Sequence, residues 1–184
     1  MKTAAPELTP VQRKFILHWG EMGARWGINR TVAQIFALLY LSPRPMTAEE
    51  LANTLSVARS NVSQSMHELL SWRLVRASSQ IGDRRDYYEA VKDVWDLFRI
   101  VLEERKRREI DPTRAVLLEC QAELAHSHHA GDRYTKERLA ELKDFLDATD
   151  SWYDKVRSMP TGALRRLFKL GDHLDKLLGL TRLR

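Results

Sequence analysis

Apolar and polar residues at the start of the chain follow the period of an α-helix. Thr9, Pro10 and Gln12 supply the cap, the first-turn proline and the capping-box partner of a helix start. A second helix, from about Arg30 to Leu41, is apolar on nearly every side, so we expect it at the centre of the core. In the first helix, apolar side chains at spacings of four, three and four predict one buried face that ends near residue 27: Phe15, Trp19, Met22 and Trp26.

Two shorter helices follow, separated by a tight turn. A capping box at Thr47–Glu50 opens the first of them, and Ser56 and Val57 make the turn. The second helix, from about Arg59 to Trp72, is expected to bury Val62, Met66 and Leu69. Its outer side is then small and polar throughout.

From residue 74 to residue 90 the pattern changes to that of β-structure. Residues 74–78 and 86–90 flank a polar segment at 81–85 and predict one hairpin, which is all of the sheet that we expect. Beyond Val91 the pattern is helical to the end, with breaks predicted at Asp111–Pro112, at 130–132 and at 159–162.

Residues 48–70 have the features of a helix pair that binds the major groove of DNA. The reading helix needs short polar side chains, a bracing neighbour and a small-residue turn between the two. The turn residue before this helix is Ala58 rather than a serine or threonine, a loss of about 1 kcal/mol of capping energy. The predicted DNA-contacting side chains of the helix are Arg59, Ser60, Asn61, Ser63 and Gln64.

The tip of the predicted hairpin is basic. Arg84 and Arg85 can reach the adjacent DNA backbone or the minor groove from one side of the reading helix. The structural alternative is a tip stiffened by surface ion pairs with Asp83 and Asp86, each of which contributes little alone. We favour the DNA interpretation because two further arginines, at 73 and 76, lie in the same local unit.

These segments resemble a known family. MTAEELANTLSVARSNVSQSMHELLSWRLV followed by GDRRDYYEA closely resembles the GbsR-type branch of the MarR-like winged-helix regulators, and the preceding WGINRTVAQIFALLYLSPRP fits that branch too. The resemblance runs from about Leu17 to Arg108. It implies a homodimeric DNA-binding regulator whose recognition helix corresponds to Arg59–Gln64 and whose wing corresponds to Asp83–Arg85. Some relatives sense choline or related osmolyte precursors, which leaves room for a small-molecule effector, although no matching set of ligand residues is found.

The C-terminal part carries two apolar stripes of helical spacing. Such stripes fit packing within one chain or between two copies, and we favour a homodimer built from terminal helices because a two-fold axis duplicates the single recognition helix. The first stripe is Leu139, Leu142, Leu146, Thr149, Tyr153 and Val156, and the second is Leu164, Leu167, Leu174 and Leu178.

The expected fold is mainly α, a winged helix-turn-helix with a two-stranded wing and additional long C-terminal dimerisation helices. We expect the DNA-binding domain at residues 1–92 and a helical linker and dimerisation region at residues 93–184.

Charge and composition agree with a DNA partner. The chain has 30 lysines and arginines against 25 acidic residues, a formal charge of +5. Its longest apolar run, Ile35–Leu41, is far shorter than the roughly 20 residues of a membrane-spanning helix, and no secretory signal is evident at the start. We therefore expect a cytoplasmic protein with no membrane partner. The single cysteine, Cys120, forms no intrachain disulfide, in keeping with a reducing compartment.

Other chemistry finds little support in the sequence. His126, His128 and His129 form the most metal-like cluster, but their spacing matches no familiar site and a polar helix end is the preferred interpretation. The five tryptophans could supply an aromatic cage for a quaternary amine, yet core packing explains them better. We expect no enzymatic activity and no cofactor, because no phosphate loop, nucleophile elbow or distinctive carboxylate pair is present.

The sequence thus predicts a sequence-specific, double-stranded DNA-binding transcriptional regulator, a ligand-responsive repressor that acts as a homodimer. Two alternatives stay open. One is a winged-helix protein-interaction module without DNA binding, and the other is a metal-responsive sensor that uses the histidine cluster.

Overall fold

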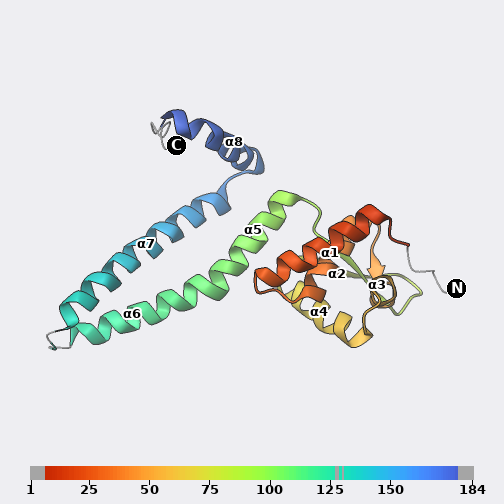
Figure 1. The fold of residues 1–184 in the computed structure, drawn as a ribbon, viewed down its shortest axis with the longest axis horizontal. Helices are drawn as coiled ribbons and strands as arrows, with labels where there is room; N and C mark the ends of the chain where they lie inside the picture. Colours follow the sequence, from red (N-terminus) through yellow and green to blue (C-terminus); the bar gives the residue numbers. More distant parts are fainter. Residues whose placement is uncertain (1–6, 127–128, 130, 178–184) are drawn as a thin grey trace. The chain divides into compact units, whose positions relative to one another are not determined.

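The computed structural model describes residues 7–126, 129 and 131–177, which form two compact units divided between Glu104 and Arg105 (Figure 1). The division falls later than the predicted boundary between residues 92 and 93. Within the described residues, no helix is both long enough and apolar enough to cross a membrane. The elements of the first unit are α1 (Pro10–Arg25), α2 (Arg30–Leu41), β1 (Met46–Thr47), α3 (Ala48–Leu55), α4 (Arg59–Ser71), β2 (Val75–Ser79), β3 (Asp86–Ala90) and α5 (Val94–Arg105).

Helix α2 lies at the centre of the first unit, as its sequence predicts. Ile35 and Leu39 are at most 1% exposed, and the helix packs against α1, α4 and β3. After β3, the Lys92 ammonium donates hydrogen bonds to the carbonyls of Leu39, Tyr40 and Ser42 at 2.6, 2.9 and 2.7 Å. A cation is favourable there because the last carbonyls of a helix have no partner within it. Lys92 therefore ties the end of the sheet to the end of α2.

The predicted aromatic stripe of α1 is confirmed in part, because Phe15 and Trp19 pack against the core, but the most deeply buried residues of the helix are others. Ile16, Gly20 and Gly23 are buried, while Phe15 and Trp19 are half-buried in a stacked pair and Trp26 is 58% exposed beyond the helix end. The glycines let α1 approach α2 closely. A Cβ at residue 23 would lie 2.6 Å from the Cβ of residue 33, and one at residue 20 would lie 2.7 Å from the side chain of residue 34. A hydrophobicity pattern does not register such a contact, because glycine contributes no apolar side chain.

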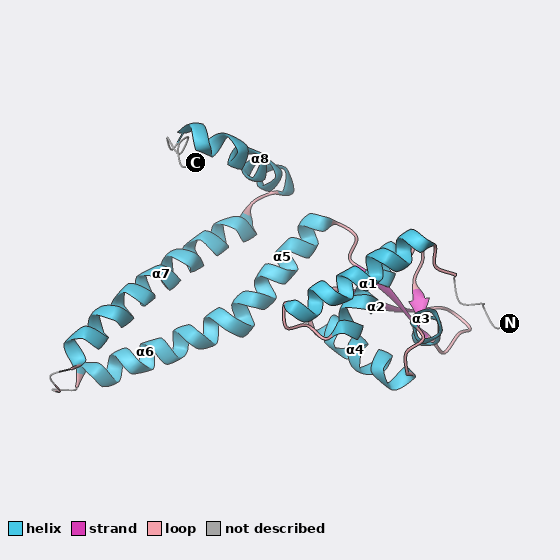
Figure 2. Ribbon diagram, in the orientation of Figure 1, coloured by secondary structure: helices cyan, strands magenta, loops and turns pink. Residues whose placement is uncertain are grey.

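The sheet has three strands instead of the two expected. The hairpin of β2 and β3 is confirmed, with Val75 opposite Ala90 and Ser79 opposite Asp86. In addition β1, only two residues long, pairs with β3 and gives the strand order β1-β3-β2. The strands are drawn in magenta in Figure 2. Two residues are too few to show a period, so the pattern alone did not predict this strand.

The helical path does not break at Asp111–Pro112. A π-helical turn (η1, Lys106–Ile110) follows α5 directly and leads into α6 (Asp111–Ala125), and the amide of Asp111 donates to the carbonyl of Lys106. Proline lacks an N–H and its ring collides with the carbonyl four residues back in a regular helix. A wider turn just before it relieves both problems, so the predicted break becomes a local change of helix type.

The predicted breaks at 130–132 and 159–162 correspond to the starts of α7 (Asp132–Ser158) and α8 (Thr161–Leu177). Helices α6 and α7 pack side by side as an antiparallel hairpin (Figure 1). Arg114 of α6 binds Asp147 and Asp150 of α7 at 2.8 and 2.5 Å. Among the side chains of this unit that the structure describes, the buried apolar ones are Leu117, Leu146, Tyr153, Val156 and Leu164.

The first predicted C-terminal stripe is buried along only part of α7. Leu146, Tyr153 and Val156 are buried, whereas Leu142 is 42% exposed. In the second stripe Leu164 is buried and Leu167 is 36% exposed. The side chain of Leu174 and all of Leu178 lie outside what the structure describes.

Candidate nucleic-acid interface

The pair α3 and α4 is fixed at the start of α3 by a buried carboxylate. Thr47 and Glu50 form the predicted capping box, in which the Glu50 carboxylate accepts from the Thr47 amide at 2.8 Å. The same carboxylate accepts from Arg44 at 2.7 Å. Burial acts to raise the pKa of Glu50, but the hydrogen bonds from Arg44 and Thr47 outweigh it and hold the pKa below its usual value. The start of α3 is thus held by the charged Glu50 carboxylate, which accepts hydrogen bonds from both Thr47 and Arg44.

The turn between the two helices uses a left-handed residue. Ser56 has φ 54°, and the Val57 amide donates to the Ala52 carbonyl at 3.0 Å, which closes the end of α3. Val62 is fully buried and Ala52 is 9% exposed, so α4 packs closely behind α3. Both observations agree with the turn and the bracing contact expected from the sequence.

The outer side of α4 is polar, and its side chains are available for contacts with another molecule. All of the predicted contact residues are exposed, and none of their side chains forms a hydrogen bond within the described part of the chain. The helix has no side-chain cap at Ala58, and its first amide with a backbone acceptor is that of Val62. The amides of residues 59–61 are therefore open to an external acceptor. The residues concerned are Arg59, Ser60, Asn61, Ser63 and Gln64.

The wing tip is held by a side-chain clamp. The Asp83 carboxylate accepts from the Arg85 amide at 2.9 Å, from its Nε at 3.0 Å and from its Nη2 at 2.6 Å. The Tyr87 hydroxyl donates to Asp83 at 2.7 Å and accepts from Arg85 at 3.1 Å. Hydrogen bonding to Arg85 lowers the pKa of Asp83 and raises that of Arg85, so both groups stay charged over the range in which proteins are folded.

The two predicted wing arginines therefore differ. Arg85 is oriented by the clamp and keeps only its Nη1 uncommitted, whereas Arg84 is exposed and has no partner among the described residues. The stiffened-tip alternative is correct for Asp83, while Asp86 forms no ion pair in that part of the chain. The sequence analysis did not predict that Tyr87 takes part in the clamp. The signal that could have indicated it is the D-x-R-x-Y spacing at residues 83–87.

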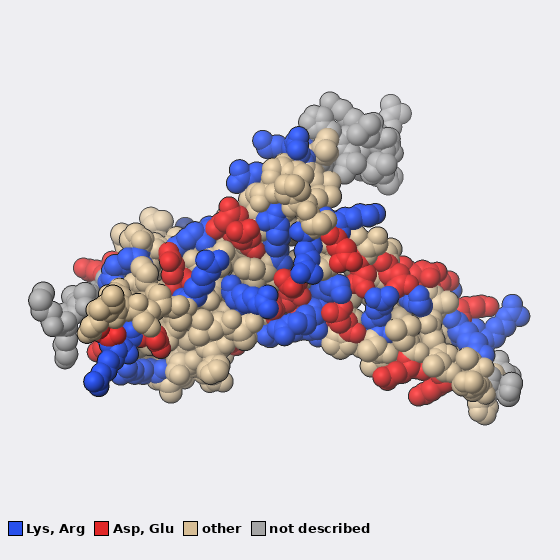
Figure 3. Space-filling view, turned by 180° about the vertical axis from the view of Figure 1, so that it is seen from behind, with Lys and Arg blue, Asp and Glu red and all other residues tan. Residues whose placement is uncertain are grey.

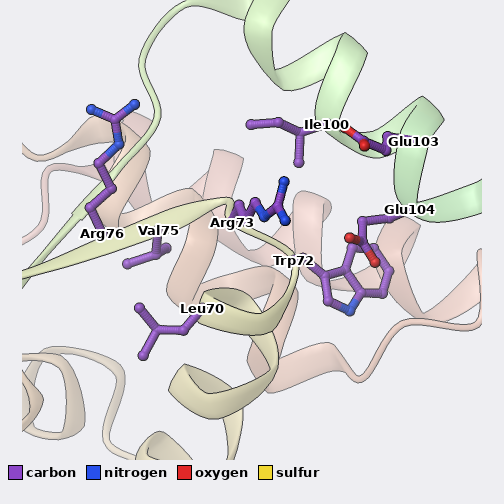
Figure 4. Close-up of a pocket in the computed structure, with 8 residues that line it drawn as sticks. All are labelled: Leu70, Trp72, Arg73, Val75, Arg76, Ile100, Glu103 and Glu104. Carbon is purple, nitrogen blue, oxygen red and sulfur yellow. The ribbon is translucent and has the colours of Figure 1, made fainter. Parts of the chain in front are cut away.

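A pocket lies where α4 meets β2 and α5 (Figure 4). Its volume is about 390 Å³, and Figure 4 shows the Arg73 side chain extending toward α5. Arg73 has φ 58°, and its amide donates to the Leu70 carbonyl while that of Leu74 donates to Leu69, so a bulky residue occupies the position that ends α4 in the left-handed region. The pocket is lined by Leu70, Trp72, Arg73, Val75, Arg76, Ile100, Glu103 and Glu104.

The sequence analysis did not predict this pocket. Its one signal is Arg73, which stands after α4 at a position where glycine is usual. Among the residues that the structure describes, no three histidine, cysteine or acidic side chains gather as metal ligands would. His128 of the predicted histidine cluster lies outside those residues, and Cys120 is half-buried.

Comparison with known proteins connects this arrangement to transcriptional regulators. The MarR family matches residues 26–86. YvaV of Bacillus subtilis (strain 168), assigned to the HTH-type transcriptional regulators, is 26% identical over 141 residues, which cover 72% of this chain and 78% of that protein. The HTH-type transcriptional repressor GbsR of the same strain is 23% identical over 136 residues, 73% of this chain and 75% of GbsR.

One solved structure, titled "Crystal Structure of a transcriptional regulator", matches with a TM-score of 0.64 at 20% identity, covering 87% of this chain and 99% of that one. At this level of identity the likeness shows a common fold. The winged-helix architecture expected from the sequence is thereby confirmed.

Proposed function

We propose that this chain, which is MarR-like over residues 26–86, is a DNA-binding transcriptional regulator that reads double-stranded DNA as a homodimer. The observation that carries the proposal is the row of exposed, uncommitted polar side chains on α4, next to a wing with one oriented arginine. Similarity to GbsR supports a repressor of the GbsR-type branch that acts in the cytoplasm.

Recognition by α4 follows from the chemistry of its outer side chains. Asn61 and Gln64 carry the amide groups that pair with adenine in the major groove, and Arg59 can donate two hydrogen bonds to guanine or one to a phosphate. Ser60 and Ser63 are short enough to let the helix approach the bases. The open amides at residues 59–61 suit a phosphate oxygen, since the helix start carries a partial positive charge.

The wing supplies contacts that carry less sequence information. Arg84 is free to neutralise a phosphate, while the clamp presents Arg85 in one orientation to the phosphates or the minor groove. Because Asp83 fixes Arg85 before binding, less side-chain entropy is lost when the complex forms.

The test uses duplexes selected from a random library by the full-length protein, with affinities measured at several salt concentrations. Asn61→Ala should relax base preference by roughly 10-fold or more at one position, in line with the value of a bidentate base contact. Arg84→Ala should weaken binding to all duplexes alike and reduce the slope of log K against log salt by about 0.9. Arg13→Ala on α1 removes the same charge from an exposed site outside the α4 and wing surface and should change neither.

A protein that selects no sequence and binds all duplexes weakly would contradict the proposal and favour the protein-interaction module. Loss of selected binding on chelation, restored by zinc, would favour the metal-responsive sensor instead. Binding that survives both the Asn61 and the Arg84 changes would show that another surface contacts DNA.

The pocket beside the wing is the proposed effector site. Arg73 and Arg76 have no partner in the described residues, and Leu70, Val75 and Ile100 give the same pocket apolar walls. Glu103 and Glu104 line the pocket too, but each already takes part in an interaction within the chain, so the two guanidiniums are the lining charges without a partner in the described residues. This lining suits a small anion with an apolar body. Benzoate serves as the probe: it should weaken binding of the wild-type protein to a selected duplex and leave Arg73→Gly unaffected, and an equal effect on both proteins would place the effector site elsewhere.

A further inference from the structure

Ile81, at the tip of the wing, is fully exposed to solvent. Its relative exposure is 109%, the highest value among the large apolar side chains that the structure describes, and Val11 follows with 78%. Single exposed apolar residues are ordinary on a protein surface, so exposure alone assigns no role to Ile81. Its place in the wing and its charged neighbours carry the inference.

The backbone fixes Ile81 at the corner of a tight turn. The Asp83 amide donates to the Gln80 carbonyl at 3.1 Å, which closes a turn over residues 80–83. Gly82, with φ 84°, takes the third position, in the left-handed region that glycine adopts without strain. Ile81 therefore occupies the second position of the turn, where no described part of the chain covers its side chain.

The clamp at the wing tip holds this turn from its other side. Asp83 is the last residue of the turn, and its carboxylate also accepts from Arg85 at 2.6 Å and from Tyr87 at 2.7 Å. In addition, a β-branched side chain has few χ1 rotamers, so Ile81 loses little conformational freedom when it is confined. The wing thus presents an apolar side chain from a backbone that is already fixed.

The surroundings of Ile81 suit a nucleic acid better than an apolar protein surface. Arg84 is exposed and has no partner among the described residues, and Arg85 keeps its Nη1 uncommitted. Of the nearby acids, Asp83 is paired with Arg85, and Asp86 lies opposite Ser79 where the strands begin. An apolar protein surface would have to bury the Arg84 charge without a partner. A DNA groove instead places phosphates on both sides of an apolar stack of bases.

We propose that Ile81 is an apolar wedge, which the wing inserts into the minor groove against one base step and which partly unstacks that step. The proposal rests on the proposed function and deepens it, because it names the feature of the duplex that the wing distinguishes. Isoleucine is one of the side chains that minor-groove proteins insert between base pairs. Pyrimidine–purine steps such as TA are the most easily unstacked, so Ile81 favours such a step beside the bases read by α4.

Charge alone would not give this selectivity. On the face of the chain drawn in Figure 3, basic and acidic side chains are interspersed instead of forming a field of one sign. A phosphate contact from Arg84 is also the same for every sequence. The free energy gained by a wedge differs between sequences, because it depends on how easily the DNA deforms at the point of insertion.

The first experiment varies residue 81 and measures affinity for a duplex selected by the full-length wild-type protein. Ile81→Ser should weaken binding roughly 10-fold, whereas Ile81→Leu, which keeps the apolar bulk, should stay within about threefold of wild type. The slope of log K against log salt should not change, because no charge is removed. Val94→Ser is the matched control, since it removes an apolar side chain of 60% exposure at the start of α5, and it should leave the affinity unchanged.

Two results of this experiment would overturn the proposal. One is an Ile81→Ser variant that binds as tightly as wild type, and the other is an Ile81→Leu variant that binds as weakly as Ile81→Ser. A protein that selects no duplex would overturn the proposed function together with the wedge. Selective binding that is indifferent to residue 81 would overturn the wedge alone.

The second experiment locates the unstacked step. A fluorescent adenine analogue, placed at one adenine of the selected duplex at a time, becomes brighter when its neighbours unstack. Saturating wild-type protein should brighten the analogue at one step beside the bases read by α4, and saturating Ile81→Ser should not. Arg84→Ala, also at saturation, should still brighten it, because this change removes a phosphate contact and keeps the wedge. Equal brightening by wild type and Ile81→Ser would overturn the proposal.

A combined change of protein and DNA completes the test. Replacing the brightened TA step by AA should weaken wild-type binding by roughly fivefold to tenfold, because the stiffer step costs more to unstack. The same replacement should change the affinity of Ile81→Ser by less than about twofold, since this variant no longer unstacks the step. Equal losses for the two proteins would show that Ile81 does not act on that step and would overturn the proposal.

Discussion

Substituting Glu50 tests how the helix pair at the DNA-facing surface is held in place. The Glu50 side chain is 7% exposed and accepts from the Thr47 amide, the Thr47 hydroxyl and the Arg44 guanidinium at 2.8, 3.1 and 2.7 Å. Glu50→Ala removes every acceptor and leaves the buried Thr47 amide without one, a loss of about 1–3 kcal/mol, with about 1 kcal/mol more for the broken capping box. The free energy of unfolding should therefore fall by roughly 2–4 kcal/mol.

Glu50→Gln should lie between wild type and Glu50→Ala. It keeps one oxygen for the Thr47 amide but loses the charge that attracts Arg44, a decrease of about 1–2 kcal/mol. Urea unfolding at pH 7, followed by circular dichroism, measures the series. Glu49→Ala changes an exposed neighbour in the same turn and should stay within about 0.5 kcal/mol of wild type.

The pH dependence gives a second, independent readout. The pKa of Glu50 is lower in the folded chain than in the unfolded one, because the bonds from Arg44 and Thr47 outweigh burial. Its contribution is therefore complete above the unfolded pKa of about 4.3 and is lost as the pH falls through the folded pKa. The gap between wild type and Glu50→Gln should close in that acidic range. A gap that is constant down to pH 3, or a Glu50→Ala variant as stable as wild type, would refute the reasoning.

Four further substitutions test the close helix contact, the strained end of α4 and the wing clamp. Gly23→Ala should lower the free energy of unfolding by about 1–3 kcal/mol because its Cβ would meet another Cβ, whereas Gly20→Ala meets only a flexible side chain and should lose less than about 1 kcal/mol; thermal unfolding compares them. Arg73→Gly should keep or raise the melting temperature, since glycine adopts φ 58° without strain, and a drop of several degrees would contradict that strain. Asp83→Ala should weaken DNA binding about three- to tenfold through loss of a fixed Arg85, with little change in melting temperature; undiminished binding would show that the clamp does not prepare Arg85.

Much of the fold could be predicted because several elements carry a strong local signal. The capping boxes at Thr9 and Thr47 and the apolar run of α2 place their elements correctly. The misreadings have a common cause, which is that the deciding contact involves no apolar side chain. Gly20 and Gly23 bring α1 onto α2 by lacking side chains, and β1 exists only through its pairing with β3.

The candidate interface could be predicted as a surface but not in detail. Small polar residues on the outer side of α4 follow from helical spacing alone, and the structure places all of them in solvent. Arg85 is held by the clamp and Arg84 is not, and this difference depends on the backbone turn at Gly82, which has φ 84°. The turn brings the Tyr87 hydroxyl to the Asp83 carboxylate. Likewise the spacing of the leucines on α7 does not show that Leu146 is buried while Leu142 is 42% exposed, because this depends on where α6 packs.

The three carbonyls that share the Lys92 ammonium affect where the first unit can be cut. A fragment that stops at residue 92 would put a terminal carboxylate beside this cation, and the new anion would compete with the carbonyls of Leu39, Tyr40 and Ser42 for its protons. The end of α2 would then lose its neutralising charge even though every residue of the wing is retained. A fragment for binding studies should instead continue to Glu104, so that its added charge lies a full helix away.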